Sequence, residues 1–244
     1  MRFRPLAFAL LSLAASPAAA QGLATPSVGI EATTDDRRRG LSWSGGRATL
    51  VADAAVPIGS ALRVDVAAAG LRDSRRHGGA DVAIDLGGRW TGEVSDWRLR
   101  AGAAGHLFAG VGGLNYAELQ AGGAYTLGPV SLDLAANYAP SQRAIGGDNL
   151  YLSAGLDAGV PATPVTVYLG GGHTSGGGDG IRAQRLRPGG NYWDYRVGAE
   201  YVLGPATAGA RLTGTSIDPD DVPAGPYVDR HFGTVIAGYV RIGF

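Results

Sequence analysis

Charged and apolar side chains alternate along much of the chain, and this spacing has direct chemical consequences. Every second residue is small, polar or charged in segments such as Leu62–Val66, Val82–Leu86 and Trp193–Tyr201. Successive side chains of a β-strand point to opposite faces, so these segments place charges on one face and apolar groups on the other. Arginines and carboxylates gathered on one face could pair across strands, because the planar guanidinium group matches a carboxylate. The same charges could orient a polar solute in water.

Four histidines are the candidates for proton transfer: His77, His106, His173 and His231. His173 and Ser175 have the histidine-x-serine spacing of the outer-membrane phospholipase. The glycine run that follows, 176–178, predicts a loop tip rather than the rigid strand that a catalytic pair needs. For His106, at a strand end, a hydrogen bond in a loop or lumen is the expected role. The sequence therefore predicts no catalytic residue and no enzyme, with an outer-membrane lipid hydrolase as an alternative hypothesis.

The sequence also lacks the motifs that typically bind metals and cofactors. The chain has no cysteine, which excludes a thiolate metal site and a cysteine nucleophile. The acidic segment 217–221 could hold calcium, but its proline and its lack of a central glycine differ from an EF-hand loop. Phosphate-binding loops and zinc spacings are absent. We therefore expect no metal and no cofactor.

The composition narrows the fold class. The chain has 41 glycines, 45% hydrophobic residues, 17% charged residues and no lysine. Disorder would require low hydrophobicity and a high net charge, and helical bundles would show helical spacing of leucine, glutamate and lysine. With 21 basic and 21 acidic residues, the chain has no basic field for nucleic acid. An all-β protein with no nucleic-acid partner is the expectation.

The first residues have the pattern of an export signal. Arg2 and Arg4 precede an apolar run from Leu6 to Ala15, and three alanines stand before Gln21. This order is typical of a cleaved secretory signal peptide, and the run is shorter than the roughly 20 residues that span a bilayer. We predict a signal peptide over residues 1–20 and a single domain over 21–244. The predicted location is the outer membrane.

Short and long connections alternate between the candidate strands. Short links such as 128–129 and 204–205 alternate along the chain with longer polar or glycine-rich links such as 34–45, 174–190 and 216–230. A transmembrane β-barrel has this asymmetry, with short periplasmic turns and longer extracellular loops. Closure also pairs every strand edge, which an open sheet in lipid cannot do. The predicted fold is all-β, a closed antiparallel transmembrane β-barrel of about twelve strands, at 27–33, 46–56, 61–69, 79–90, 97–107, 115–127, 129–138, 148–159, 164–173, 191–203, 206–215 and 231–244.

Strand parity then divides the side chains between the lipid and the lumen. The charged positions expected to line the lumen are Glu31, Arg47, Asp53, Arg63, Asp65, Asp85, Arg89, Arg98, Arg100, Glu118, Asp133, Asp157, Asp194, Arg196, Glu200, Arg211 and Arg241. The aromatic residues expected in the two girdles at the membrane surfaces are Trp90, Trp97, Tyr125, Tyr138, Trp193, Tyr201, Phe232 and Phe244. Lumen glycines, including Gly122 and Gly198, favour open space between the charges.

Several segments resemble known outer-membrane barrels. Phe244, with Ile242 two positions earlier, resembles the C-terminal signal that the barrel-assembly machinery reads. The segment Thr33–Ser44 is similar to the opening motif of the TorF-type porin family, in which Arg39, Gly40 and Ser42 keep their places while residues 36–38 replace an aromatic stretch. Segments 148–152 and 192–198 are similar to later parts of that family. The resemblance implies an outer-membrane β-barrel with a transport role.

The sequence is compatible with two states of the lumen, a water-filled pore and a salt-bridged plug. Charges in a water-filled pore would orient small polar solutes, whereas a salt-bridged plug would stabilise the barrel and conduct little. The predicted function is a porin-like channel for passive diffusion of small polar or charged solutes. The alternative is a non-conducting barrel with a structural or adhesive role through its loops. Expected partners are outer-membrane lipids, lipopolysaccharide, the assembly machinery and the solutes, and the arginine-rich loop 182–187 could constrict the mouth, contact lipopolysaccharide or simply lie exposed.

Overall fold

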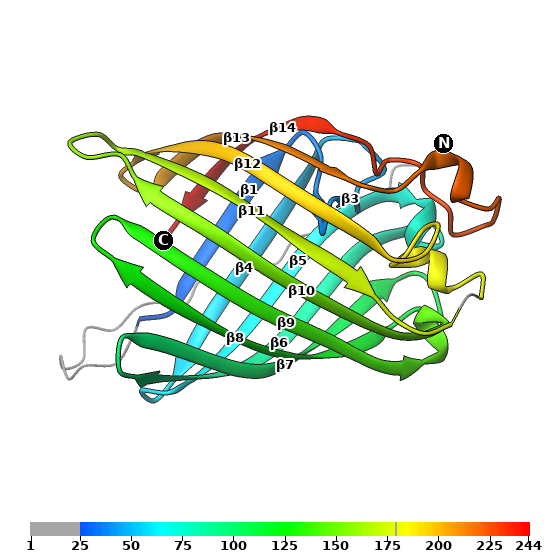
Figure 1. Cartoon of the computed structure of the whole chain (residues 1–244), viewed down its shortest axis with the longest axis horizontal. Coiled ribbons are helices and arrows are strands. Elements are labelled where there is room, and N and C mark those ends of the chain that lie inside the picture. The colour runs from blue at the N-terminus through cyan, green and yellow to red at the C-terminus, as the bar shows by residue number, and fades with distance from the viewer. Residues whose placement is uncertain (1–24, 179) are drawn as a thin grey trace.

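Twelve antiparallel strands close into one barrel in the computed structural model, which describes residues 25–178 and 180–244 (Figure 1). The predicted signal peptide lies outside the described residues. Each strand predicted from the alternating pattern has its counterpart, so the predicted fold class is confirmed. The wall strands are β1 (Ser27–Thr33), β4 (Thr49–Ile58), β5 (Leu62–Ser74), β6 (Ala80–Val94), β7 (Trp97–Ala109), β8 (Tyr116–Leu127), β9 (Val130–Gln142), β10 (Gly147–Gly159), β11 (Val165–Ser175), β12 (Tyr192–Leu203), β13 (Ala206–Thr215) and β14 (Val235–Gly243).

The first and last wall strands complete the closure. β1 pairs with β14 on one side and with β4 on the other, so every wall strand is paired on both sides. Backbone hydrogen bonds between Val28 and Phe244 extend this pairing beyond the end of β14. Closure satisfies the backbone amides and carbonyls that water cannot reach in a bilayer.

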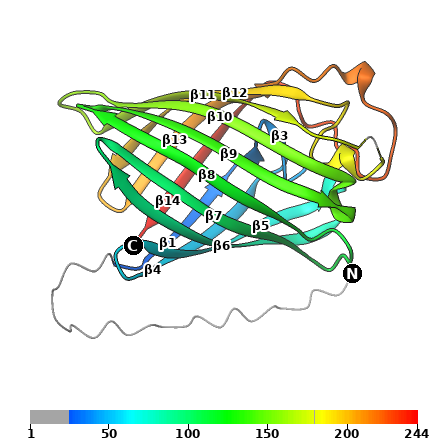
Figure 2. The same ribbon diagram turned by 60° about the horizontal axis from the view of Figure 1, so that its bottom comes forward.

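The two ends of the barrel differ in their connections. At the short-turn end, tight links such as Gly59–Ala61, Gly128–Pro129 and Gly204–Pro205 join neighbouring strands. At the loop end, longer segments carry the short 3₁₀ turns η1 (Arg75–His77), η2 (Arg143–Ile145), η3 (Ala183–Arg185) and η4 (Pro219–Asp221), and they lie over the barrel opening (Figures 1 and 2). No helix in the described part of the chain is long and apolar enough to cross a membrane.

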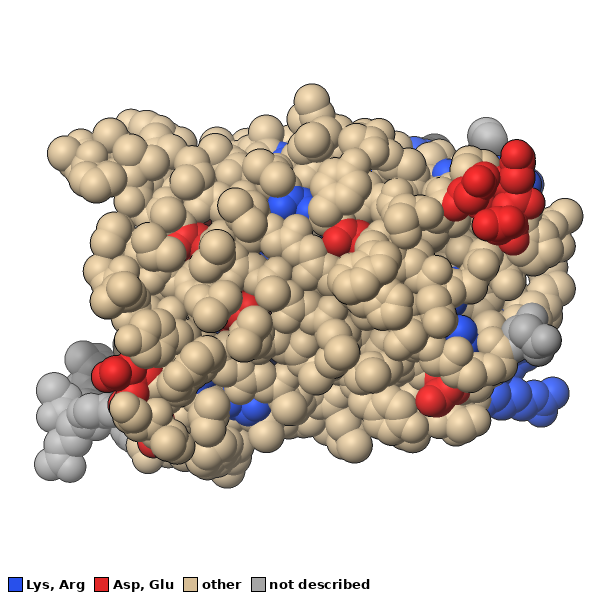
Figure 3. All heavy atoms as spheres, viewed as in Figure 1, with Lys and Arg blue, Asp and Glu red and all other residues tan. Residues whose placement is uncertain are grey.

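Apolar side chains cover the outer wall. Val66, Leu86 and Leu134 are exposed and face away from the barrel axis, while the charged residues next to them face inward. In Figure 3 the side of the barrel is mostly uncharged, and the charged groups that protrude gather at its ends. Water would penalise such a surface, whereas lipid would not, because burying apolar area in an apolar phase contributes about 25 cal/mol per Å². The outer wall therefore has the apolar surface that a lipid bilayer requires.

A charge in the middle of this wall should destabilise the barrel. Leu86 lies near the centre of β6 and is 45% exposed. We expect Leu86→Arg to lower the free energy of unfolding in lipid vesicles by about 2–4 kcal/mol, because it places a guanidinium group at the bilayer midplane. Leu127→Arg, at the short-turn end of β8, is the matched control and should cost about 0–1 kcal/mol. Equal costs at the two positions would contradict the membrane-facing orientation.

Candidate functional site

A hairpin folds from the end of β1 into the barrel. After Thr33 the chain enters the lumen, forms the two-stranded ribbon β2 (Arg37–Arg38) and β3 (Leu41–Ser42), and returns to the wall at the start of β4. Arg39 and Gly40 make its two-residue turn, with φ values of 52° and 73°. Positive φ at both central residues is the geometry of a type I′ turn, which fits the twist of a short hairpin. We call residues 34–48 the inner hairpin.

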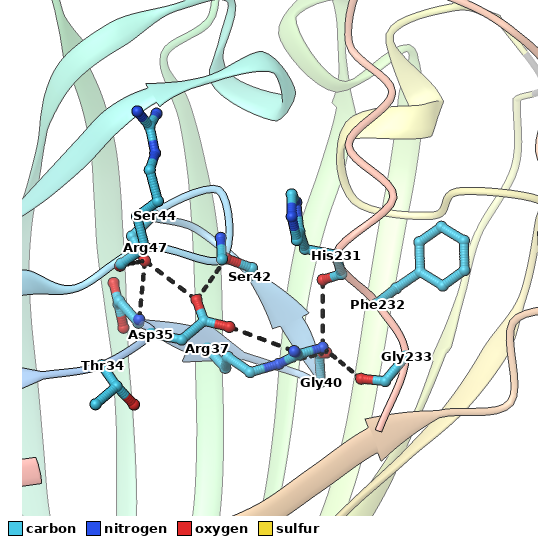
Figure 4. A network of polar contacts seen from close by, with 12 residues as sticks. Thr34, Asp35, Arg37, Gly40, Ser42, Ser44, Arg47, His231, Phe232 and Gly233 are labelled. Atoms are coloured by element: carbon cyan, nitrogen blue, oxygen red, sulfur yellow. Dashed lines mark hydrogen bonds and ion pairs between the residues drawn. The ribbon is translucent and has the colours of Figure 1, made fainter. Parts of the chain in front are cut away.

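Asp35 holds the base of the inner hairpin together. Its buried carboxylate accepts hydrogen bonds from the hydroxyls of Ser42 and Ser44, at 2.6 and 3.1 Å, and pairs with Arg37 at 3.3 Å. Arg37 also donates to the carbonyls of His231 and Gly233 in the loop before β14, as Figure 4 shows. One carboxylate and one guanidinium group therefore fix the hairpin to itself and to the last long loop.

Arg38 and Arg39 extend from the hairpin to the barrel wall. Arg38 pairs with Asp85 of β6 at 2.6 Å, and its guanidinium group lies 3.9 Å from the ring centre of Trp43. Arg39 pairs with Glu118 of β8, also at 2.6 Å. The Glu118 side chain is only 1% exposed, so this contact is shielded from bulk water. Ion pairs of this kind keep much of their strength, because little solvent screens them.

His106 of β7 joins the two ion pairs into one network. Its Nδ1 lies 2.7 Å from Asp85, and its Nε2 lies 3.7 Å from Glu118. The ring also stacks on Tyr116, with 4.5 Å between ring centres. Two arginines of the hairpin, two carboxylates and one histidine of the wall thus form a continuous polar chain across three strands. We call this chain of five side chains the constriction, since the hairpin that carries its two arginines occupies the lumen at this level.

The loops above the hairpin pack as a small core. Arg76 and Arg185 are fully buried, and each donates to the backbone carbonyl of the other, at 2.8 and 3.1 Å. His77 is buried between the rings of Trp43 and Phe108, at 4.4 and 4.6 Å. Burial lowers the pKa of His77 well below its ordinary value, and the charges of Arg185 and Arg76 lower it further, so the ring is neutral at pH 7.

A second buried carboxylate anchors the loop before β14. Asp229 accepts hydrogen bonds from Ser74 at 3.3 Å and from the ring of His231 at 2.6 Å. Burial alone raises the pKa of Asp229, but the hydrogen bonds from His231 and the charge of Arg76 outweigh it and leave the pKa below its ordinary value. Asp229 is therefore ionised at neutral pH. Buried side chains therefore pack together in the loops at this end of the barrel.

The short-turn half of the lumen is different, because its ion pairs stay accessible to water. The side chains of Arg63 and Arg89 are 51% and 37% exposed, and both pair with Asp65. Asp133 pairs with Arg100, and Asp53 holds Arg241 through two hydrogen bonds of 2.6 and 2.9 Å. Charges of both signs therefore line a wet vestibule below the constriction.

The remaining predicted lumen residues lie as follows. Arg98 contacts Glu93 at 3.8 Å at the short-turn rim, and Arg211 contacts Glu31 at 3.9 Å. Glu200 accepts a hydrogen bond from Tyr239 at 2.8 Å, and Asp194 accepts one from Tyr151 at 3.2 Å. Asp157 and Arg196 are exposed on the inward-facing side of their strands. The inward parity of these strand residues follows from the pairing register.

Beside two of the lumen glycines, Gly122 and Gly198, long side chains occupy the space that the sequence predicted to be open. An added Cβ at Gly122 would lie 2.8 Å from the guanidinium group of Arg100, and one at Gly198 would lie 2.5 Å from the ring of Tyr168. Arg100 and Tyr168 are the direct cross-strand partners of these glycines. The glycines give room for large side chains to lie flat along the lumen wall.

Two predicted positions need correction, because the strands begin later than the alternation suggests. Arg47 is exposed in the return of the inner hairpin, before β4 begins at Thr49, and it does not line the lumen. Phe232 precedes β14, is 3% exposed and packs with Leu41 and Tyr192, so it belongs to no aromatic girdle. The other seven girdle candidates have outward parity in the strands or, for Phe244, directly after β14: Trp90, Trp97, Tyr125, Tyr138, Trp193, Tyr201 and Phe244.

Several site residues were absent from the predicted set. Arg38 and Arg39 sit in a segment predicted to be an external link, and His106 was given no specific partner. A signal for the hairpin exists in the sequence, since Arg39-Gly40 is a two-residue turn between Arg38 and Leu41, which pair with each other. His173 faces outward, with its ring 4.5 Å from that of Trp193, and makes no hydrogen bond or ion pair among the described residues.

A closed twelve-stranded antiparallel barrel with an apolar outer wall and a charged interior defines the class of outer-membrane β-barrels. Within this class, the chain belongs to the Gcw_chp family, which is described as a bacterial protein of unknown function and whose model matches residues 17–230. The sequence matches no curated protein.

Solved structures of outer-membrane channels share the fold. The NanC porin superposes with a TM-score of 0.55 at 9% identity, over 88% of this chain and 97% of that chain. The KdgM porin, in complex with disordered oligogalacturonate, gives 0.53 at 8% identity, over 89% and 96%. An outer-membrane channel from Pseudomonas putida F1 gives 0.53 at 13% identity, over 92% and 96%. At these identities the likeness establishes the fold.

Proposed function

We propose that the protein is a porin-like channel through which small polar or charged solutes diffuse passively, with the inner hairpin as its constriction. The observation that carries the proposal is the placement of Arg38 and Arg39 opposite Asp85 and Glu118 inside the barrel. Paired charges of both signs inside the lumen create a local electric field that orients dipolar solutes passing beside them. Below the constriction, the ion pairs are accessible to water, so this half of the lumen would give solutes a path to the short-turn end.

The proposal includes the finer identity and location of the chain. The similarity of Thr33–Ser44 to the TorF-type porins, together with the porin neighbours, supports membership of that type. We infer that residues 1–20 are cleaved on export, that the barrel resides in the outer membrane, and that the assembly machinery inserts it. The chain then acts without catalysis or a cofactor, since transport is diffusive. Its short turns would face the periplasm and its loops the outside.

A non-conducting barrel is the second candidate, and the packing at the loop end favours it. Leu71, Leu114 and Ile145 are fully buried there with the two arginines that hold the loops together. Such a cover suits a barrel that acts through its outer surface. The two candidates differ in whether the hairpin and loops open.

Conductance in planar bilayers tests the proposal. We expect the folded wild-type protein to give stepwise openings with a low open probability, because the ion pairs of Arg38 and Arg39 hold the inner hairpin inside the lumen. Arg100→Glu should shift the reversal potential in a salt gradient towards cation selectivity, since it replaces a positive charge in the vestibule. Arg143→Glu, in an exposed part of the loops, is the matched control and should leave selectivity unchanged. Silence of the wild type and of a variant with the hairpin released would establish the non-conducting barrel.

A further inference from the structure

A basic pocket and an apolar groove adjoin at the loop end of the barrel. The pocket has a volume of about 470 Å³ and is lined by Arg47, Arg75, Arg230 and His231. The groove has a volume of about 1430 Å³ and lies on the outer wall. Arg47 and Asp73 line both, so the two form one continuous surface from the loops to the wall.

The groove faces the membrane. Its floor consists of small outward-facing residues, including Ala52, Ala68 and Gly238, and its sides are larger apolar residues such as Leu50 and Val240. The groove is lined by residues of β1, β4, β5, β6, β13 and β14, around the seam where the barrel closes. Small side chains beneath larger ones form a channel into which flexible hydrocarbon chains fit, because apolar contact is gained along their whole length.

The charges at the top of the groove favour an anion. Arg47, Arg72, Arg75 and Arg230 line the pocket or the groove, and within the described residues none of these four forms an ion pair. Three carboxylates lie near them, but Asp229 is buried and already bonded to Ser74 and His231. Asp73, Asp81 and the ionised Asp229 therefore oppose four arginines, which leaves a net positive charge at this surface. Guanidinium groups bind phosphate oxygens with paired, charge-assisted hydrogen bonds.

We infer that this surface binds a phosphorylated, multiply acylated lipid of the outer leaflet, with its phosphates in the basic pocket and its acyl chains in the groove. A ligand with a compact anionic head and several hydrocarbon chains satisfies both parts at once. A free anion would use only the pocket, and a zwitterionic lipid would leave the arginines without a net counter-charge. The inference does not depend on conductance, because the surface lies outside the lumen.

Native mass spectrometry of the detergent-purified full chain tests the inference with lipid A, phosphatidylcholine and inorganic phosphate as probes. We expect the wild type to retain lipid A in preference to phosphatidylcholine. Arg47→Ala/Arg75→Ala should weaken retention of lipid A by at least about tenfold, because two charge-assisted contacts to phosphate are lost. Ala52→Trp, which fills the groove from its exposed floor, should weaken it as well.

Matched controls separate this site from general effects on the barrel. Arg143→Ala removes an exposed loop arginine outside the pocket, and Ala103→Trp adds an indole to the outer wall away from the groove. Both should bind lipid A like the wild type, and heat-modifiable migration should show that every variant is folded. Equal retention by all variants would overturn the inference. Phosphate binding that is lost in the arginine variant, with lipid A retention unaffected by Ala52→Trp, would instead assign the pocket to a free anion.

Discussion

Replacing Arg38 and Arg39 together with alanine is expected to raise the ratio of open to closed time in planar bilayers by about a hundredfold. The two side chains tie the inner hairpin to the wall through Asp85 and Glu118. Each pair is largely shielded from solvent, and losing about 1.4 kcal/mol per pair changes the population of the released hairpin about tenfold. The hundredfold figure is the value for two independent pairs, and coupling through their shared neighbour His106 would appear as a smaller effect of the double variant than the product of the two single effects.

Lysine and single alanine variants distinguish the effect of the ion pairs from the effect of side-chain volume. Arg38→Lys/Arg39→Lys keeps both positive charges and most of the length but loses the stacking of the guanidinium groups on Trp43 and Tyr151, so its open probability should lie between those of the wild type and the double alanine variant. Single alanine variants should fall between the wild type and the double variant. His106 still faces both carboxylates in the double variant, so the wall keeps a partner for them. An unchanged conductance in the folded double variant would mean that the hairpin is not the barrier.

The wall could be predicted from the sequence because two strong constraints agree there. One face of each strand must suit lipid and the other must not, and a shift of one residue would exchange the two faces. Val82–Leu86 shows the pattern directly, since Asp85 faces the lumen and Leu86 the membrane. The alternation of short and long links also predicted which end of each strand lies at the short turns and which at the long loops. Together these constraints fixed parity, strand number and the position of most charges.

The constriction could not be predicted in the same way, because nothing local distinguishes a loop that folds inward from one that stays outside. The inner hairpin is polar, as external loops are, and its burial becomes favourable only when Asp85 and Glu118 are already in place on distant strands. The predicted first residues of β4 and β14 were wrong for a related reason. Arg47 and Phe232 continue the alternation, but contacts within the loops, such as the packing of Phe232 on Tyr192, end the strand pairing first.

The same dependence on distant partners makes Arg185 decisive for the cover at the loop end. Its guanidinium group donates to the carbonyls of Arg76 at 3.1 Å, Leu114 at 2.8 Å and Ala144 at 2.7 Å. It also lies 4.8 Å from the ring centre of Phe108. Burial lowers the pKa of Arg185 to about 10, so the group remains charged at pH 7. One side chain thus connects four segments that are far apart in sequence.

Arg185→Ala is therefore expected to open the loop cover while leaving the barrel wall intact. The variant leaves three buried carbonyls without a donor and creates a cavity beside Phe108, which together reduce the free energy of local opening by about 3 kcal/mol. Amide hydrogen exchange in residues 75–79, 110–116 and 143–147 should become about a hundredfold faster. The amides of β6 and β9, measured in the same sample, should keep their protection. The open probability in bilayers should rise as well if the cover obstructs the path.

Two neighbouring substitutions identify the cause. Arg185→Met fills most of the space without donating hydrogen bonds, and it also removes the cost of burying a charge, so its effect should be smaller than that of alanine. Arg182→Ala, three residues away, removes a guanidinium group that donates from an exposed position to Gly113 and Arg143, and it should change exchange only slightly. Exchange in the three segments that is equally fast in the Arg182 and Arg185 variants would contradict the role of Arg185. A methionine variant as open as the alanine variant would show that hydrogen bonds to the carbonyls, rather than packing against Phe108, hold the loops closed.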